Sequence, residues 1–167
     1  MTKNNYIKVI DFFTKHLFML KTLRFLYKIL PLFVFATYPT IVFLYGLQNG
    51  FLNNTFYKIL FIPFCTFIAV TIFRKIFNFE RPYEKYNTKN LTNKDTIGKS
   101  FPSRHVASAF IIAITLFYLN NTLGIIYFAI GFVIALTRIF AGVHFIRDVV
   151  AAALFSLLVG IVFLFLI

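Results

Sequence analysis

Long apolar segments alternate with short polar ones along most of this chain. Five apolar segments are candidates to cross a bilayer as helices: residues 29–47, 56–73, 103–119, 123–136 and 149–167. A transmembrane helix needs about 20 mainly apolar residues, and the polar turns between several of these segments are short enough to join antiparallel neighbours. The pattern predicts an all-α fold, a polytopic transmembrane helical bundle of five spans.

The first 28 residues follow a different pattern. Apolar side chains recur there at three- and four-residue steps, and six cations lie largely on the opposite side of the helix that this spacing predicts. Such an amphipathic helix is better suited to lying in the membrane interface than to crossing it, with a sixth span as the alternative. We therefore expect an amphipathic segment at 1–28 and a transmembrane domain at 29–167.

Composition agrees with a membrane location. Hydrophobic residues make up 60% of the chain and charged residues only 13%, which leaves too little polar surface to cover a soluble domain. The net charge of +12 indicates an anionic partner, either lipid headgroups or a phosphorylated substrate. Nucleic acid is disfavoured as a partner, because the sequence shows no basic aromatic groove and no nucleic-acid-binding motif.

Topology brings two distant polar segments together. With five or six spans, alternate connections lie on the same side of the membrane, so residues 74–99 and 138–147 face the same water. We interpret most of residues 86–96, in the middle of the longer connection, as a solvated loop. The cations at the span ends are expected to meet.

Two histidines occupy positions suited to chemistry. Ser103 is a predicted N-cap, which places His105 in the first turn of a helix whose free N–H groups attract anions. His144 and Asp148 are four residues apart, so on a helix they would share a face, and the carboxylate would fix the tautomer of the imidazole. Taken singly, a capping serine and a surface ion pair are the ordinary explanations of these patterns.

The neighbouring cations favour phosphate over a metal ion. A metal site built from His105, His144 and Asp148 is conceivable, but guanidinium groups close by would repel a divalent cation. The same groups suit a phosphate through charge and forked hydrogen bonds. The candidate phosphate-binding residues are Arg74, Arg81, Ser103, Arg104 and Arg138.

Three motifs in these segments resemble those of the type 2 phosphatidic acid phosphatase (PAP2) superfamily, in order and in spacing. They read Arg74-x6-Arg81-Pro82, Pro102-Ser103-Arg104-His105 and Thr137-Arg138-x5-His144-x3-Asp148. The resemblance covers residues 56–167 and departs from the family pattern at three positions. Arg74 replaces a lysine, with Lys75 as a substitute for it, Arg104 replaces a glycine, and Thr137 replaces a serine.

The resemblance implies a bacterial membrane lipid phosphatase that needs no metal or other cofactor. His144 would attack phosphorus and form a phosphohistidine, Asp148 would orient its ring, and His105 would protonate the leaving oxygen. Arg74, Arg81, Ser103 and Arg138 would hold the phosphoryl oxygens. Arg104, in place of the glycine, would supply another cation. The substrate would enter sideways from the bilayer, and phosphatidic acid, phosphatidylglycerol phosphate and undecaprenyl diphosphate are the candidates, the last slightly favoured.

Other functions stay open. A non-catalytic lipid-binding or transport protein could keep the phosphate pocket without turnover, and haloperoxidases share the motifs but are soluble. The positive-inside rule would place the polar loops in the cytoplasm. Relatives of this family usually face outward, and we expect an extracytoplasmic site in the bacterial plasma membrane.

Overall fold

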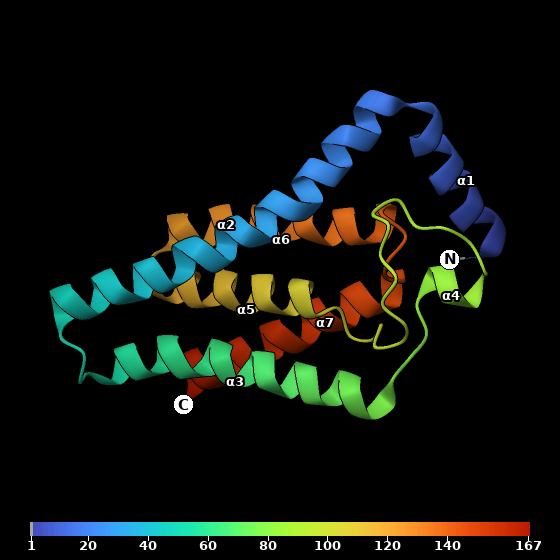
Figure 1. The fold of residues 1–167 in the computed structure, drawn as a ribbon. Coiled ribbons are helices and arrows are strands. Elements are labelled where there is room, and N and C mark those ends of the chain that lie inside the picture. The colour runs from blue at the N-terminus through green and yellow to red at the C-terminus, as the bar shows by residue number, and fades with distance from the viewer. Residues whose placement is uncertain (1) are drawn as a thin grey trace.

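The computed structural model describes residues 2–167, and in this range it is all-helical, without a strand (Figure 1). The helices are α1 (Lys3–Lys15), α2 (Leu17–Asn49), α3 (Asn54–Phe77), α4 (Pro82–Lys85), α5 (Arg104–Leu119), α6 (Asn121–Phe140) and α7 (Ile146–Gly160), which continues into the π-helical turn η1 (Ile161–Leu166). The predicted all-α fold is confirmed.

Five helices account for the predicted spans. Four segments are long and apolar enough to cross a membrane: Leu17–Asn49, Asn54–Lys85, Asn121–Phe140 and Ile146–Leu166. The apolar helix α5 is shorter, at 16 residues, and it packs against α3, α6 and α7. Ten of its residues are buried, so the other helices shield α5 from lipid over most of its length. The chain has the architecture of an integral membrane protein.

Side-chain caps begin two of the long helices. Asn53 accepts a hydrogen bond from the backbone N–H of Phe56 at 2.7 Å, and Asn120 accepts one from that of Leu123 at 3.0 Å. Asn78 ends α3 in the left-handed conformation, with a φ of 40°. These helix starts and ends agree with the expectation from the sequence that polar turns separate neighbouring spans.

The N-terminal segment differs from its prediction as one helix over residues 1–28. Helix α1 ends at Lys15, and His16, with φ −112° and ψ 84°, separates it from α2. Residues 17–28 instead belong to α2, which runs unbroken through Pro31 and Pro39, so position 28 marks no break in the chain. One cation of this stretch binds a loop: Arg24 Nε donates to Leu91 O at 2.6 Å.

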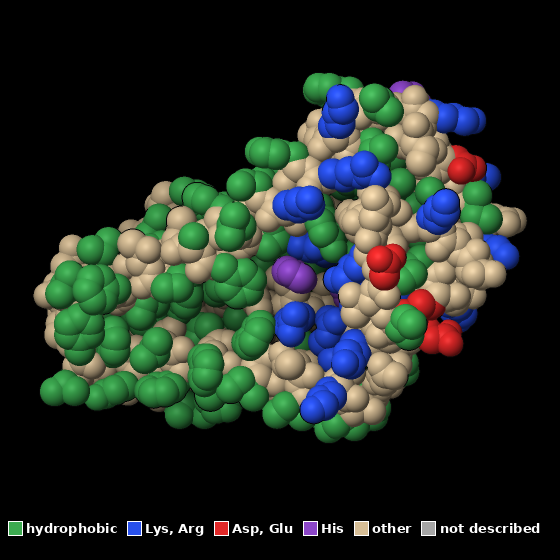
Figure 2. Space-filling view, viewed as in Figure 1, with side chains coloured by type: hydrophobic (Ala, Val, Ile, Leu, Met, Phe, Trp, Pro, Cys, Tyr) green, Lys and Arg blue, Asp and Glu red, His purple; other side chains and the backbone are tan. Residues whose placement is uncertain are grey.

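The polar connections pack together at one end of the bundle, as the topology predicts. Leu91 is 3% exposed, and its backbone N–H donates to Ala141 O at 3.1 Å. The Ser103 N–H donates to Asp148 O at 2.9 Å. Most of residues 86–96 are exposed or half-buried, as predicted for a solvated loop, but Leu91 anchors this loop to the bundle. Figure 2 shows Lys and Arg side chains gathered at this end of the visible face and mainly apolar side chains over the other end.

Candidate active site

A polar cavity of about 320 Å³ lies where these loops meet the helix ends. Five of the eight predicted site residues line it: Arg74, Arg81, Arg104, His105 and His144. Five further residues complete the lining: Thr71, Lys75, Lys94, Thr96 and Lys99. In Figure 2 a histidine is visible in a hollow bordered by Lys and Arg side chains. The cavity is therefore strongly cationic.

The first motif supplies two arginines with different surroundings. Arg74, on the last turns of α3, donates from Nη1 to Pro102 O at 2.8 Å, and Lys75 lines the cavity beside it. Arg81 is 1% exposed and makes three hydrogen bonds to backbone carbonyls. The acceptors are Gly98 O (2.9 Å, from Nε), Val143 O (3.1 Å, from Nη1) and Lys99 O (3.3 Å, from Nη2). Since a guanidinium has five N–H donors, Arg81 joins two loops and keeps two donors for an anion.

The second motif lies at the start of α5. Ser103 is at the N-cap position, as predicted, but its side chain makes no cap hydrogen bond. Its Oγ is buried without a hydrogen-bond partner among the described residues. Arg104 and His105 begin the helix and line the cavity, and Arg104 Cζ lies 5.3 Å from the centroid of the Phe67 ring. An unpaired hydroxyl beside the helix N-terminus is suited to a bound phosphoryl oxygen.

The third motif brings His144 to Asp148, and Ser100 lies between them. His144 Nδ1 is 3.6 Å from Asp148 Oδ2 and 3.5 Å from Ser100 Oγ. The Ser100 hydroxyl donates to Asp148 Oδ2 at 2.5 Å, and all three side chains are buried. With an acceptor-only carboxylate on this side, the proton of the imidazole belongs on Nδ1, which leaves Nε2 free as a nucleophile.

The reason for this contact differs from the predicted one. His144 does not share a helix with Asp148, because α7 begins at Ile146 and His144 lies in the preceding turn. Asp148 folds back over that turn, and its Oδ2 accepts from the Phe145 N–H at 3.0 Å. The same carboxylate thus caps the helix and meets the imidazole.

Burial and nearby cations set the protonation of the nucleophile. Burial is the main cause that lowers the pKa of His144 to about 3, and Arg81 and Arg74 lower it further. The hydrogen bond and the charge of Asp148 act in the opposite direction. The imidazole is therefore neutral at physiological pH, the state in which it can attack an electrophile.

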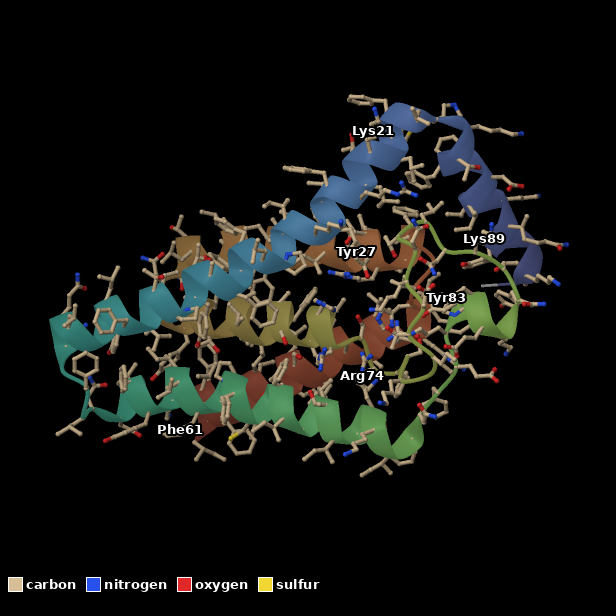
Figure 3. All side chains as sticks on the ribbon, in the orientation of Figure 1. Lys21, Tyr27, Phe61, Arg74, Tyr83 and Lys89 are labelled. Carbon is tan, nitrogen blue, oxygen red and sulfur yellow. The ribbon has the colours of Figure 1, made fainter. Side chains whose placement is uncertain are left out.

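Arg138 is placed differently from the other predicted phosphate-binding arginines. It is 2% exposed and does not line the cavity; its Nη2 donates to Tyr27 O at 3.1 Å, and its Cζ lies 3.7 Å above the Tyr27 ring. Its Nε has no hydrogen-bond partner among the residues that the structure describes. Tyr27 on α2 and Arg74 on α3 lie at the same end of the bundle (Figure 3). Arg138 thus fastens α6 to α2 beside the site.

Five residues of this region were not singled out from the sequence: Thr71, Lys94, Thr96, Lys99 and Ser100. Ser100 directly precedes the second motif, and its position there was the signal available for it. Lys94 and Thr96 line the cavity from the loop that we expected to be solvated. Across residues 2–167, no group of three or more His, Cys, Asp or Glu side chains is placed to hold a metal ion.

Comparisons with known proteins agree with the motifs. The profile of the PAP2 superfamily matches residues 17–167. The bacitracin transport permease protein BcrC of Bacillus licheniformis is 31% identical over 96 residues, which is 55% of this chain and 47% of BcrC. The match thus spans about half of that relative. The crystal structure of Aquifex aeolicus LpxE has the same fold, with a TM-score of 0.63 at 24% identity over 87% of this chain and 93% of LpxE.

The resemblance drawn from the three motifs is therefore confirmed by a match that covers most of the chain. Helix α1 lies outside the matched range, whereas all eight predicted site residues lie within it. This chain belongs to the PAP2 superfamily of phosphatases.

Proposed function

We propose that this protein hydrolyses the phosphate or diphosphate ester of a membrane lipid, through a phosphohistidine on His144 and without a metal ion. One observation carries the proposal: a buried, neutral His144, held by Ser100 and Asp148, opens into the same cationic cavity as His105. Six Lys and Arg side chains line that cavity, and their charge would repel a divalent metal while it attracts a phosphate.

The reaction would proceed in two steps. Nε2 of His144 attacks phosphorus, the bond from phosphorus to the leaving oxygen breaks, and His105, which the bound anionic phosphate would charge, gives that oxygen its proton. Water then attacks the phosphohistidine, His105 takes up a proton from the water, and the P–N bond breaks to release inorganic phosphate and restore His144. Asp148 and Ser100 hold the Nδ1–H throughout, and the cavity cations stabilise the charge that develops on the phosphoryl oxygens.

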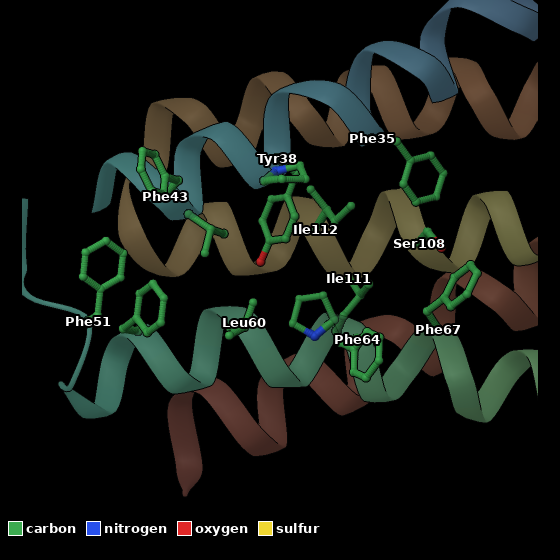
Figure 4. Close-up of a pocket in the computed structure, with 14 residues that line it drawn as sticks. Phe35, Tyr38, Phe43, Phe51, Leu60, Phe64, Phe67, Ser108, Ile111 and Ile112 are labelled. Carbon is green, nitrogen blue, oxygen red and sulfur yellow. The ribbon is translucent and has the colours of Figure 1, made fainter. Parts of the chain in front are cut away.

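An apolar groove beside the cavity supports a lipid substrate that enters from the bilayer. It has a volume of about 490 Å³ and is lined almost entirely by apolar side chains of α2, α3 and α5 (Figure 4). Phe67 lines the groove and lies 5.3 Å from Arg104, which lines the polar cavity. A lipid could thus place its tail along the helices and its headgroup at the histidines.

Phosphatidic acid, phosphatidylglycerol phosphate and undecaprenyl diphosphate are the substrates we consider, the last with a slight preference. The site would face outward from the bacterial plasma membrane. A cysteine introduced at Asn90, in the loop above the site, would then react with an impermeant label on intact cells. Reaction only after permeabilisation would place the site inside.

A second candidate is a lipid-binding or transport protein without turnover. It is favoured by the description of the relative BcrC as a transport permease. Hydrolysis separates the two candidates, since a binding protein would leave a lipid phosphate intact.

The test is phosphate release by the purified protein in detergent with EDTA present, using the three lipids. His144→Ala should abolish phosphate release. The matched control is His16→Ala, at an exposed histidine between α1 and α2, and this variant should release phosphate as the wild type does. A phosphoryl group trapped on the wild-type protein, acid-labile and absent from His144→Ala, would support the intermediate. Equal release by both variants would refute the assignment, and silence of the wild type on all three lipids would favour the binding protein.

A further inference from the structure

Lys94 lies on the loop between α4 and α5, outside the three motifs, yet it faces the active site. It lines the cavity together with His105, His144 and Arg104, and it is half-buried rather than solvated. A lysine in such a position has lost much of its hydration, so its charge needs a partner.

Asn90 fixes the backbone that carries Lys94. The Asn90 Oδ1 accepts from the N–H groups of Thr92 and Lys94, each at 3.0 Å, and the Asn90 Nδ2 donates to Lys94 O at 2.7 Å. Leu91, inside this turn, is buried and bonded to Ala141 O, as described above. The turn is therefore anchored to the bundle, and the position of Lys94 over the cavity is built into the fold.

The charges that act most strongly on Lys94 are those of arginines. No carboxylate lies within ion-pair distance of it among residues 2–167. Burial, followed by the charges of Arg81, Arg138, Arg74 and Arg104, lowers the pKa of Lys94 to about 8. These arginines come from α3, α5, α6 and the loop after α3, so no packed element compensates the ammonium group. An anionic ligand would remove this repulsion.

The motif arginines leave room for such a role. Arg81 uses three of its donors on backbone carbonyls, and Arg138 packs on Tyr27 outside the cavity lining. The motif arginines therefore supply fewer donors to the phosphoryl oxygens than the sequence predicts. Lys94 and Arg104 line the cavity and make no hydrogen bond through their side chains in the described part of the chain.

We propose that Lys94 is a substrate-binding residue, whose ammonium group contacts the oxygens of the bound phosphate. The inference rests on the proposed function only in taking this cavity as a phosphate-binding site. The ammonium group of Lys94 would bind any dianionic phosphate, whether it belongs to a lipid headgroup or is free in solution.

The test measures binding of inorganic phosphate to the purified protein in a non-ionic detergent, by isothermal titration, and needs no turnover. At neutral pH, Lys94→Met should weaken binding about tenfold or more, which is the usual effect of losing a charge-assisted hydrogen bond. Lys94→Arg should restore most of it. The control is Lys89→Met, which removes an exposed lysine of the same loop that does not line the cavity, and it should bind as the wild type does.

The pH dependence gives a second readout that a merely structural role would not produce. Lys94 loses its proton as the pH rises through about 8, so wild-type phosphate affinity should fall over that range. Lys94→Arg should keep its affinity there, since arginine stays charged, and Lys94→Met should bind weakly with no such fall.

These outcomes separate the inference from the proposed function. If Lys94→Met binds phosphate as tightly as the wild type does, the inference is overturned, even if the enzyme is active. The inference is also overturned if the wild type binds no phosphate. Binding that depends on Lys94 in a protein that hydrolyses no lipid would support the inference and refute the enzymatic assignment.

Discussion

The Ser100 hydroxyl gives the sharpest test of how the nucleophile is held. His144 Nδ1 and Asp148 Oδ2 are 3.6 Å apart, which is too long for a good direct hydrogen bond. Ser100 Oγ donates to that carboxylate oxygen at 2.5 Å and lies 3.5 Å from the imidazole nitrogen. We therefore expect Ser100 to be the residue that couples Asp148 to His144.

The magnitude follows from the type of bond that Ser100→Ala removes. A hydrogen bond to a charged group contributes about 1.5–3 kcal/mol. If that energy holds the imidazole in its attacking orientation, its loss corresponds to a decrease of roughly 10- to 100-fold in kcat. The backbone of Ser100 keeps its own bond, from its N–H to Phe79 O at 2.8 Å, so the loop should stay in place.

Ser156→Ala is the matched control for this change. Ser156 is also a fully buried serine, and its Oγ donates at 2.8 Å to Ala107 O, a neutral acceptor away from the cavity. Both variants should unfold at a lower temperature than the wild type, and only Ser100→Ala should lose turnover per folded molecule. The assay is kcat and KM on one lipid phosphate, alongside a thermal unfolding scan. A kcat for Ser100→Ala within twofold of that for Ser156→Ala would refute the reasoning (roughly 0.4 kcal/mol, well below the expected bond energy).

Two further variants test the elements around the site. Tyr6→Phe removes a hydroxyl that donates to Lys89 O at 3.1 Å and Gly142 O at 3.3 Å, and should lower the free energy of unfolding by about 0.5–1.5 kcal/mol, measured against Tyr57→Phe at an exposed position. Ser108→Leu replaces a groove-lining hydroxyl that has no hydrogen-bond partner in the described residues, and should raise KM for a long-chain lipid phosphate but not for a small chromogenic phosphate. Equal KM changes on both substrates would contradict the assignment of the groove to the tail.

The bundle could be predicted because its helices repeat a simple signal. Apolar runs of span length mark α2, α3, α6 and α7, and the alternation of their connections places both polar loops at one end. The helix starts at Asn54 and Asn121 follow capping asparagines that are visible in the sequence. The break at His16 carried no such signal, since neither proline nor glycine marks it.

The site was predictable only where residues belong to spaced motifs. His105 and His144 lie in one cavity as expected, although the helix argument for His144 and Asp148 was wrong in detail. Ser100 and Lys94 depend on how loops fold over the helix ends, and such contacts leave no periodic trace in a sequence. The interior position of Arg138 depends likewise on Tyr27, more than a hundred residues earlier.

The hydrogen-bond acceptors of the buried arginines affect how strongly the cavity attracts phosphate. Arg74, Arg81 and Arg138 donate to backbone carbonyls. The ion pair found among the described residues joins Arg147 to Asp148, which also lies beside the neutral His144. Carbonyl oxygens satisfy N–H donors without cancelling charge, whereas carboxylates would neutralise the cations and compete with the substrate. With 17 Lys and Arg residues against five Asp and Glu, the chain keeps this positive charge uncompensated. The anion that completes the site therefore has to come from outside the protein, which is what a phosphate-binding cavity requires.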